Sequence, residues 1–146
     1  MVVVVQRVSH ASVAVGGREV SRIARGLLLL VGIAEGDGEG QVADMARQVA
    51  RMRVFADASG RLALPLSEVG GEALAVSQFT LLGDFAKGNR PSFHGAARPE
   101  VARPLFDAFL LALGTELGRP VASGVFGADM RVTLENDGPV TFVLET

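Results

Sequence analysis

The stretch GLLLLVGIA, residues 26–34, is the longest uncharged apolar run in the chain. It is far shorter than the roughly 20 residues that a helix needs to span a bilayer. A short, continuous apolar run is typical of a strand that lies inside the core. The run therefore predicts a buried strand over 27–34, and with it a sheet at the centre of the protein.

The segments on either side of this run predict more strands and two helices. Before it, strands are expected at 2–9, 11–16 and 18–24, with a short turn and a Gly-Gly pair between them. After it, the apolar residues of 39–53 recur at helical spacing: Val42, Met45, Ala46, Val49 and Met52. A second helix is predicted over 98–118, with Pro104 in an irregular first turn. Its apolar residues in register are Val101, Leu105, Phe109, Leu113 and Leu117.

The remaining patterns predict strands. Residues 55–64 are expected to form a hairpin that turns through 57–60, and residues 71–81 a further strand. Two final strands, 129–135 and 139–145, flank the turn former Asn-Asp-Gly. This order predicts one α/β domain over residues 1–146, with a mostly antiparallel sheet and two main helices.

Composition limits the chemistry that the chain can perform. There are no cysteines and only two histidines, which leaves no thiol nucleophile, thiolate zinc site or His-rich metal site. We therefore expect neither a metal nor a cofactor, and we interpret His10 and His94 as surface residues. The opening MVVVVQRV lacks the features of a signal peptide, which predicts a cytoplasmic protein. A hydrophobic content of 49% favours an oligomer.

The strand AVSQFTL, residues 75–81, is the first candidate for a functional site, because it carries three polar side chains in an apolar setting. Strand alternation places Gln78 and Thr80 on one face and Ser77 and Phe79 on the other. Gln78 and Thr80 are thus the pair expected to face a ligand. The alternative is a structural strand whose hydroxyl groups find partners within the protein.

Two further segments indicate a nucleic-acid ligand. Residues 85–103 carry four cations against one acidic residue, a local charge of +3 within a net charge of −2. Gly and Pro make this segment a loop, in which Lys87 and Arg90 can contact phosphates. In GVFGADM, residues 124–130, Phe126 and Met130 can pack against a base. An ordinary solvated loop and an ordinary core segment are the alternatives.

Four motifs together resemble the D-aminoacyl-tRNA deacylases. They are SQFTL (77–81), KGNRPSF (87–93), GVFGADM (124–130) and NDGPVT (136–141). The N-terminal VVQRVSHASVAVGG is also similar, so the resemblance covers the whole chain. It implies a barrel-like fold and hydrolysis of the ester between a D-amino acid and the 3′-terminal adenosine of tRNA. It also implies a homodimer with its active sites at the interface, and no metal.

The resemblance assigns roles to individual residues. Ser77, Gln78, Phe79 and Thr80 match the catalytic wall of the pocket, and Phe126 and Met130 match positions associated with the terminal adenine. Asn136, Gly138 and Pro139 match a turn whose cis Gly-Pro bond reaches into the partner's pocket, and Arg7 matches the arginine that steadies it. Leu82 and Phe85 depart from the family pattern, so no polar contact is expected from their side chains.

Hydrolysis at this site is expected to depend on how the substrate and the water are positioned, and not on an activated protein nucleophile. Thr80 is the one hydroxyl on the expected ligand face, and the sequence shows no base beside it. We therefore favour hydrolysis by water, with the Phe79 N–H as an oxyanion donor and the tRNA 2′-hydroxyl assisting, as in the family. Rigid main chain at the α-carbon would reject L-amino acids, whereas glycine would fit, so activity on mischarged Gly-tRNA is also expected. A binder of RNA 3′ ends without catalysis and a purely structural oligomer are the alternatives.

Overall fold

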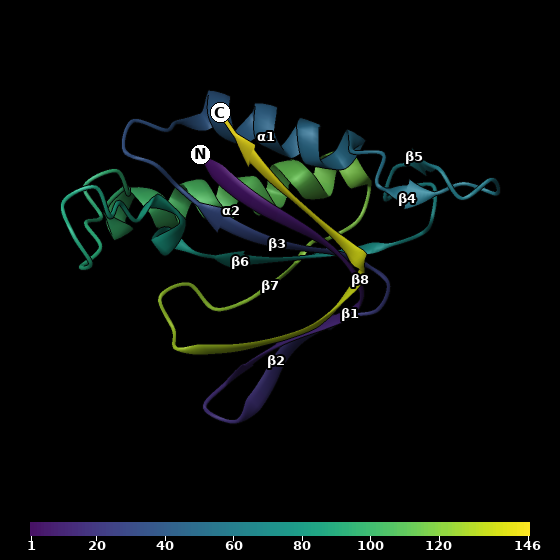
Figure 1. The fold of residues 1–146 in the computed structure, drawn as a ribbon, viewed down its shortest axis with the longest axis horizontal. Coiled ribbons are helices and arrows are strands. Elements are labelled where there is room, and N and C mark those ends of the chain that lie inside the picture. The colour runs from purple at the N-terminus through teal and green to yellow at the C-terminus, as the bar shows by residue number, and fades with distance from the viewer.

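The computed structural model describes residues 1–146 throughout, as a curved mixed sheet covered by two helices (Figure 1). The elements in chain order are β1 (Val2–Val15), β2 (Arg18–Ile23), β3 (Gly26–Gly32), α1 (Glu39–Arg51), β4 (Phe55–Ala56), β5 (Leu62–Leu64), β6 (Glu72–Ser77), the 3₁₀ helix η1 (Phe79–Leu82), α2 (Pro99–Leu117), β7 (Ala122–Ser123) and β8 (Met130–Glu145). The predicted α/β class, the barrel-like sheet and the two helices are confirmed.

Strand β1 organises the sheet, because it pairs antiparallel with three other strands. Its first half pairs with β3 and its second half with β2, while β8 pairs along its whole length on the other edge. The sequence predicted two strands with a turn near His10, which is wrong. A bulge between Val8 and His10 in the pairing with β8 lets β1 bend while it remains one strand.

The other half of the sheet is parallel. β3 pairs parallel with β6, and β6 pairs parallel with the short strand β7, which the sequence did not predict. The crossover connections carry α1 and α2, since parallel neighbours cannot be joined by a tight hairpin. The predicted hairpin over 55–64 is confirmed as β4 and β5.

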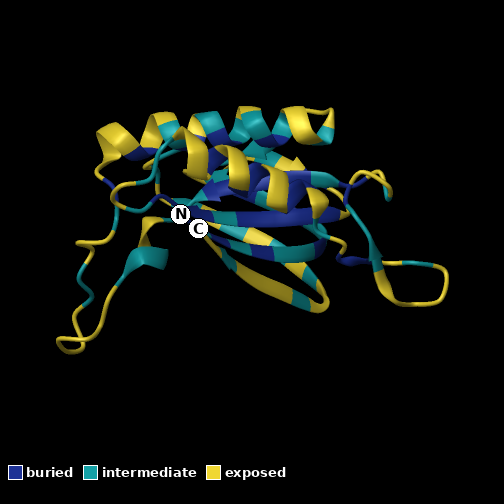
Figure 2. Ribbon diagram, turned by 90° about the horizontal axis from the view of Figure 1, so that it is seen from above, coloured by how far each residue is buried: buried dark blue, intermediate teal, exposed yellow.

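Both faces of β3 are buried, which explains its uninterrupted apolar sequence. Leu27, Leu29 and Val31 pack into the large cluster beneath the two helices, whereas Leu28 belongs to a smaller cluster on the opposite face. Each fully buried leucine stabilises the fold by about 1.5–3 kcal/mol. Figure 2 shows the buried strands below helices whose outer faces are exposed.

The two predicted helices differ in how well the sequence located their buried faces. In α1, Val42, Met45 and Val49 are buried as predicted. In α2 the chain continues in helical form through Pro104, but Val101 is 48% exposed and the buried face begins at Ala102. Two adjacent rows of α2 are apolar, so helical spacing alone could not choose between them. Neither helix has the length and hydropathy needed to cross a membrane.

Candidate functional site

Strand β6 ends at Ser77, and the chain then turns into the short helix η1. The sequence predicted a strand as far as residue 81, which is wrong. The last ladder hydrogen bond is made by the Gln78 N–H, which donates to the Val31 carbonyl at 2.8 Å. Beyond it β6 has no partner, because β3 ends at Gly32 and β7 pairs only with Leu74 and Ala75. A strand without neighbours leaves its backbone groups unpaired, and a 3₁₀ turn pairs some of them internally.

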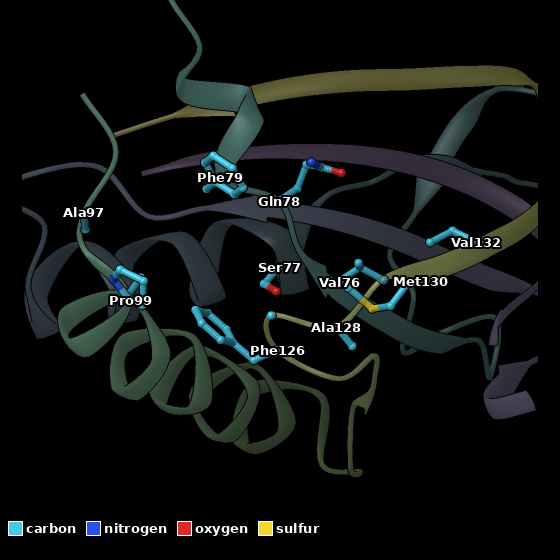
Figure 3. Close-up of a pocket in the computed structure, with 12 residues that line it drawn as sticks. Val76, Ser77, Gln78, Phe79, Ala97, Pro99, Phe126, Ala128, Met130 and Val132 are labelled. Atoms are coloured by element: carbon cyan, nitrogen blue, oxygen red, sulfur yellow. The ribbon is translucent and has the colours of Figure 1, made fainter. Parts of the chain in front are cut away.

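A cavity of about 360 Å³ opens where β6 ends (Figure 3). Its walls come from the end of β6, the start of α2 and the segment that leads into β8. The twelve lining residues, mostly apolar, are Val76, Ser77, Gln78, Phe79, Ala97, Pro99, Ala102, Phe126, Gly127, Ala128, Met130 and Val132. Residues from two of the four motifs, SQFTL and GVFGADM, therefore meet around one space.

The turn into η1 changes which side chains face this cavity. Ser77, Gln78 and Phe79 line it, whereas Thr80 is exposed and is not among its lining residues. The predicted pairing of Gln78 with Thr80 toward a ligand stays a prediction. The Gln78 side-chain amide donates a hydrogen bond to the Thr80 hydroxyl. The Ser77 side chain is half-buried at the cavity wall, and Figure 3 shows it on the side that faces Phe126.

The first turn of η1 supplies backbone donors. A 3₁₀ helix bonds each N–H to the carbonyl three residues earlier, so its first N–H groups have no partner within it. The first such bond in η1 runs from the Leu81 N–H to the Gln78 carbonyl, at 3.3 Å. The N–H groups of Phe79 and Thr80 therefore have no partner within the helix, and Phe79 lies in the cavity wall.

The opposite wall carries the aromatic and thioether side chains that the sequence singled out. Phe126 packs against Phe106 with ring centroids 6.1 Å apart, and the Arg103 guanidinium lies 5.6 Å from its centroid. Both Phe126 and Met130 line the cavity, as the prediction of a base-binding surface requires. The sequence did not indicate that Ala97, Pro99 and Ala102 would form part of the wall, because small apolar side chains carry no chemical signal.

The segment around Pro139 is a bulge in β8, and the predicted hairpin there is wrong. Val8 pairs with Asn136 and Gln6 with Thr141, so residues 137–140 of β8 lie opposite Arg7 alone. The two predicted strands, 129–135 and 139–145, are thus parts of one strand, β8, which begins at Met130 and runs along β1 in a single direction. A bulge accommodates proline because its extra residues are not needed as ladder donors.

This bulge is held at its base and exposed at its tip. The Asn136 side-chain amide donates to the carbonyls of Arg7 and Val140, at 3.1 Å each. The Gly138-Pro139 peptide bond is cis, and Gly138 has a φ of +128°. Gly138 and Pro139 are both exposed, and neither lines the cavity of its own chain.

The basic loop forms a second, polar cavity of about 340 Å³. Its lining is Leu82, Asp84, Lys87, Arg90, Ser92, His94 and Gly95. Lys87 and Arg90 are exposed, and neither forms a salt bridge.

The other histidine, His10, lies away from this cavity, in β1 opposite Glu135. No group of three His, Asp or Glu side chains is placed to hold a metal ion.

Sequence comparisons place the chain beside known deacylases. It matches the family described as D-Tyr-tRNA(Tyr) deacylase over residues 4–145. It is 49% identical over 146 residues to the D-aminoacyl-tRNA deacylase of Porphyromonas gingivalis, covering 100% of this chain and 97% of that protein. Its identity to the D-aminoacyl-tRNA deacylase of Chromobacterium violaceum is 53% over 146 residues, with the same coverage.

Solved structures share the fold over nearly the whole chain. The c-Myc DNA Unwinding Element Binding Protein superposes with a TM-score of 0.92 at 42% identity, covering 100% of this chain and 99% of that one. A probable eukaryotic D-amino acid tRNA deacylase superposes with a TM-score of 0.86 at 18% identity, covering 98% and 97%. At that identity the second likeness shows the fold alone.

The fold, the cavity and the relatives together place this chain in the class of hydrolases that act on aminoacyl-tRNA. Within that class, the chain belongs to the D-Tyr-tRNA(Tyr) deacylase family. Its activity is accordingly D-aminoacyl-tRNA deacylation, the hydrolysis of an ester bond. The resemblance seen in the four motifs is thereby confirmed.

Proposed function

We propose that the chain removes D-amino acids from tRNA in the cytoplasm and rejects L-amino acids by main-chain shape, as a homodimer with shared active sites. The observation that carries this proposal is the meeting of Ser77–Phe79 with Phe126 and Met130 around one cavity. An apolar space with a few polar groups at one end suits an aminoacyl-adenosine, whose base needs packing and whose ester needs donors.

The terminal adenine is assigned to the wall formed by Phe126 and Met130. Phe126 is backed by Phe106 and by the Arg103 guanidinium, so its ring is supported from behind. A supported ring loses little freedom when a base packs against it, which favours binding. The ester carbonyl is then directed toward the end of β6.

Hydrolysis at this site uses water and not a protein nucleophile. The Thr80 hydroxyl accepts a hydrogen bond from Gln78 and has no histidine or carboxylate beside it to take its proton. Water therefore attacks the ester carbonyl, the bond to the ribose 3′ oxygen breaks, and that oxygen leaves with a proton. The Phe79 N–H stabilises the oxyanion, and the neighbouring ribose 2′-hydroxyl assists the water.

Selection against L-amino acids is assigned to Gly138 and Pro139 of the partner subunit. These residues are exposed on a bulge and lie outside the cavity of their own chain, which is the arrangement expected of a segment that completes a neighbour's site. The exposed apolar side chains of Phe142 and Val143, on the same strand, suit a subunit interface. Main chain close to the α-carbon excludes an L side chain whatever its chemistry.

Two further features of the substrate follow from this proposal. Glycine has no side chain to exclude, so mischarged Gly-tRNA is also hydrolysed. The tRNA strand runs from the cavity toward the basic loop, where Lys87 and Arg90 contact phosphates.

The test is deacylation of D-Tyr-tRNA, L-Tyr-tRNA and Gly-tRNA measured side by side with the purified chain. Rapid loss of the D-Tyr and Gly esters with the L-Tyr ester intact is the expected result. A protein that binds tRNA ends without catalysis would protect the D-Tyr ester instead. Equal hydrolysis of the D- and L-Tyr esters would overturn the proposed selection, and a monomeric active species would overturn the shared site.

A further inference from the structure

The polar cavity beside η1 has the composition of an anion site. Six of its seven lining residues are not hydrophobic, and its volume of about 340 Å³ is close to that of the first cavity. Two of its side chains, Lys87 and Arg90, are cationic, against one carboxylate, Asp84. The Asp84 carboxylate accepts a hydrogen bond from the Ala86 N–H at 2.8 Å, so it is engaged by the loop's own backbone.

The two cations are available to a ligand. Four other arginines of the chain, including Arg22, Arg47 and Arg131, lie within salt-bridge distance of a carboxylate. Neither Lys87 nor Arg90 has such a partner, and neither side chain donates a hydrogen bond within the protein. Free cations at the wall of a cavity favour a phosphate, which offers several strong acceptors.

Backbone hydrogen bonds hold the cavity in shape without a ligand. Asp84 and Ser92 exchange two N–H to carbonyl bonds of 2.8 Å, which close the loop on itself. The far end is tied to the core, because the Glu35 N–H donates to the Gly95 carbonyl at 2.8 Å and the Ala97 N–H to the Ile33 carbonyl at 3.0 Å. A site ordered in advance loses less entropy when it binds a ligand.

A pair of aromatic rings connects the two cavities. Phe79 lines the first cavity and packs edge-to-face against Phe93, with centroids 4.9 Å apart. Phe93 is flanked in sequence by Ser92 and His94, which line the second cavity. Helix η1 also connects the cavities, because its first residue, Phe79, lines the first cavity and its last residue, Leu82, lines the second. The two cavities are therefore neighbours on one path along the surface.

We propose that the second cavity binds the nucleotide that precedes the terminal adenosine, with the phosphate that links the two held by Lys87 and Arg90. This inference rests on the proposed function, in which the first cavity holds the terminal adenosine. The exposed rings of Phe79 and Phe93 offer a stacking surface at the step between the nucleotides. Ser92 and His94 supply polar groups for the sugar and the base.

The test compares two small substrates, the D-tyrosyl ester of adenosine and the D-tyrosyl ester of the dinucleotide CpA. The second differs from the first by one phosphate and one nucleotide. The wild-type chain is expected to show a kcat/KM at least about tenfold higher for the dinucleotide, the effect of a charge-assisted hydrogen bond. In the double variant Lys87→Ala/Arg90→Ala this ratio is expected to fall about tenfold from the wild-type value, because the phosphate loses its charged partners. In the control Arg18→Ala, an exposed arginine of β2, the ratio is expected to stay at the wild-type value.

The outcomes separate this inference from the proposed function. If the wild-type chain hydrolyses D-Tyr-tRNA and both small esters but shows no preference for the dinucleotide, the second cavity is not a nucleotide site. A double variant that keeps the wild-type ratio overturns the inference in the same way. If the wild-type chain hydrolyses none of the three esters, the proposed function fails and the inference with it.

Discussion

Arg7 and Asp137 are joined by two interactions across the bulge of β8. The Arg7 Nε donates to the Asp137 main-chain carbonyl at 3.1 Å and lies 3.3 Å from a carboxylate oxygen of the same residue. The other end of the Arg7 guanidinium donates to the Val54 carbonyl at 2.8 Å. One side chain thus ties the residue before Gly138 to the segment that follows α1.

Replacing Arg7 by lysine is expected to loosen this bulge. A lysine keeps the charge, but its single nitrogen cannot span both the Val54 and Asp137 carbonyls as the guanidinium does. Arg7→Lys should lower the free energy of unfolding by about 1.5–3 kcal/mol, the range for hydrogen bonds to charged groups, as measured by urea denaturation. Deacylation of D-Tyr-tRNA should fall as well. Arg18→Lys is the matched control, and equal behaviour of the two variants would mean that Arg7 does not support the bulge.

Gly138→Ala is expected to damage the bulge for a steric reason. A Cβ at this position would lie 2.9 Å from the Val140 side chain and 3.1 Å from the Arg7 guanidinium, and the φ of +128° is unfavourable for alanine. The strain should cost about 1–3 kcal/mol, and kcat/KM for D-Tyr-tRNA should fall at least about tenfold. Gly60→Ala is the control, because Gly60 also has a positive φ but a Cβ there meets nothing within 4 Å. Full activity of Gly138→Ala would remove Gly138 from the proposed site.

Thr80→Ala is expected to keep most of the deacylase activity. Thr80 lies outside the cavity lining and has no base beside it, so it is not placed to act as a nucleophile. Single-turnover deacylation of D-Tyr-tRNA measures the chemical step directly. A decrease of about 10⁴-fold or more, with the fold intact, would instead return Thr80 to the role of nucleophile.

Truncation of Phe126 is expected to weaken substrate binding more than it slows chemistry. Stacking of a base on an aromatic ring contributes about 1–3 kcal/mol, so Phe126→Ala should raise KM for D-Tyr-tRNA roughly tenfold or more. Leu111→Ala, which removes an apolar side chain that is 75% exposed, controls for surface effects. If KM is unchanged while kcat falls, Phe126 does not hold the adenine.

Charge removal from the basic loop should change the salt dependence of tRNA binding. Each phosphate that is no longer neutralised by a cation should reduce the slope of log Kd against log salt by about one unit. Lys87 and Arg90 share one phosphate, so the double variant Lys87→Ala/Arg90→Ala is expected to flatten the slope by about one unit in filter-binding measurements between low and moderate salt. An unchanged slope would show that the loop is not part of the tRNA surface.

Local patterns in the sequence were enough to predict the fold class, both helices and the identity of the motif residues. The buried strand at 27–34 and the helical spacing of Val42, Met45 and Val49 depend on periods of a few residues, which the sequence displays directly. The motif residues Gln78 and Phe126 could likewise be named in advance, because their chemistry stands out from their neighbours.

Pairing between distant segments, in contrast, became visible only in the folded chain. Whether residues 135–142 form a hairpin or a bulge depends on whether the flanking strands pair with each other or with β1, which lies about 130 residues away in the chain. Thr80 leaves the cavity wall for a related reason, since β6 has no neighbours after Ser77. Ala97, just before α2, and Ala102, within it, line the cavity because the fold places them there, and not because their side chains have a distinctive chemistry. Such interactions arise from long-range packing, which short-period patterns do not encode.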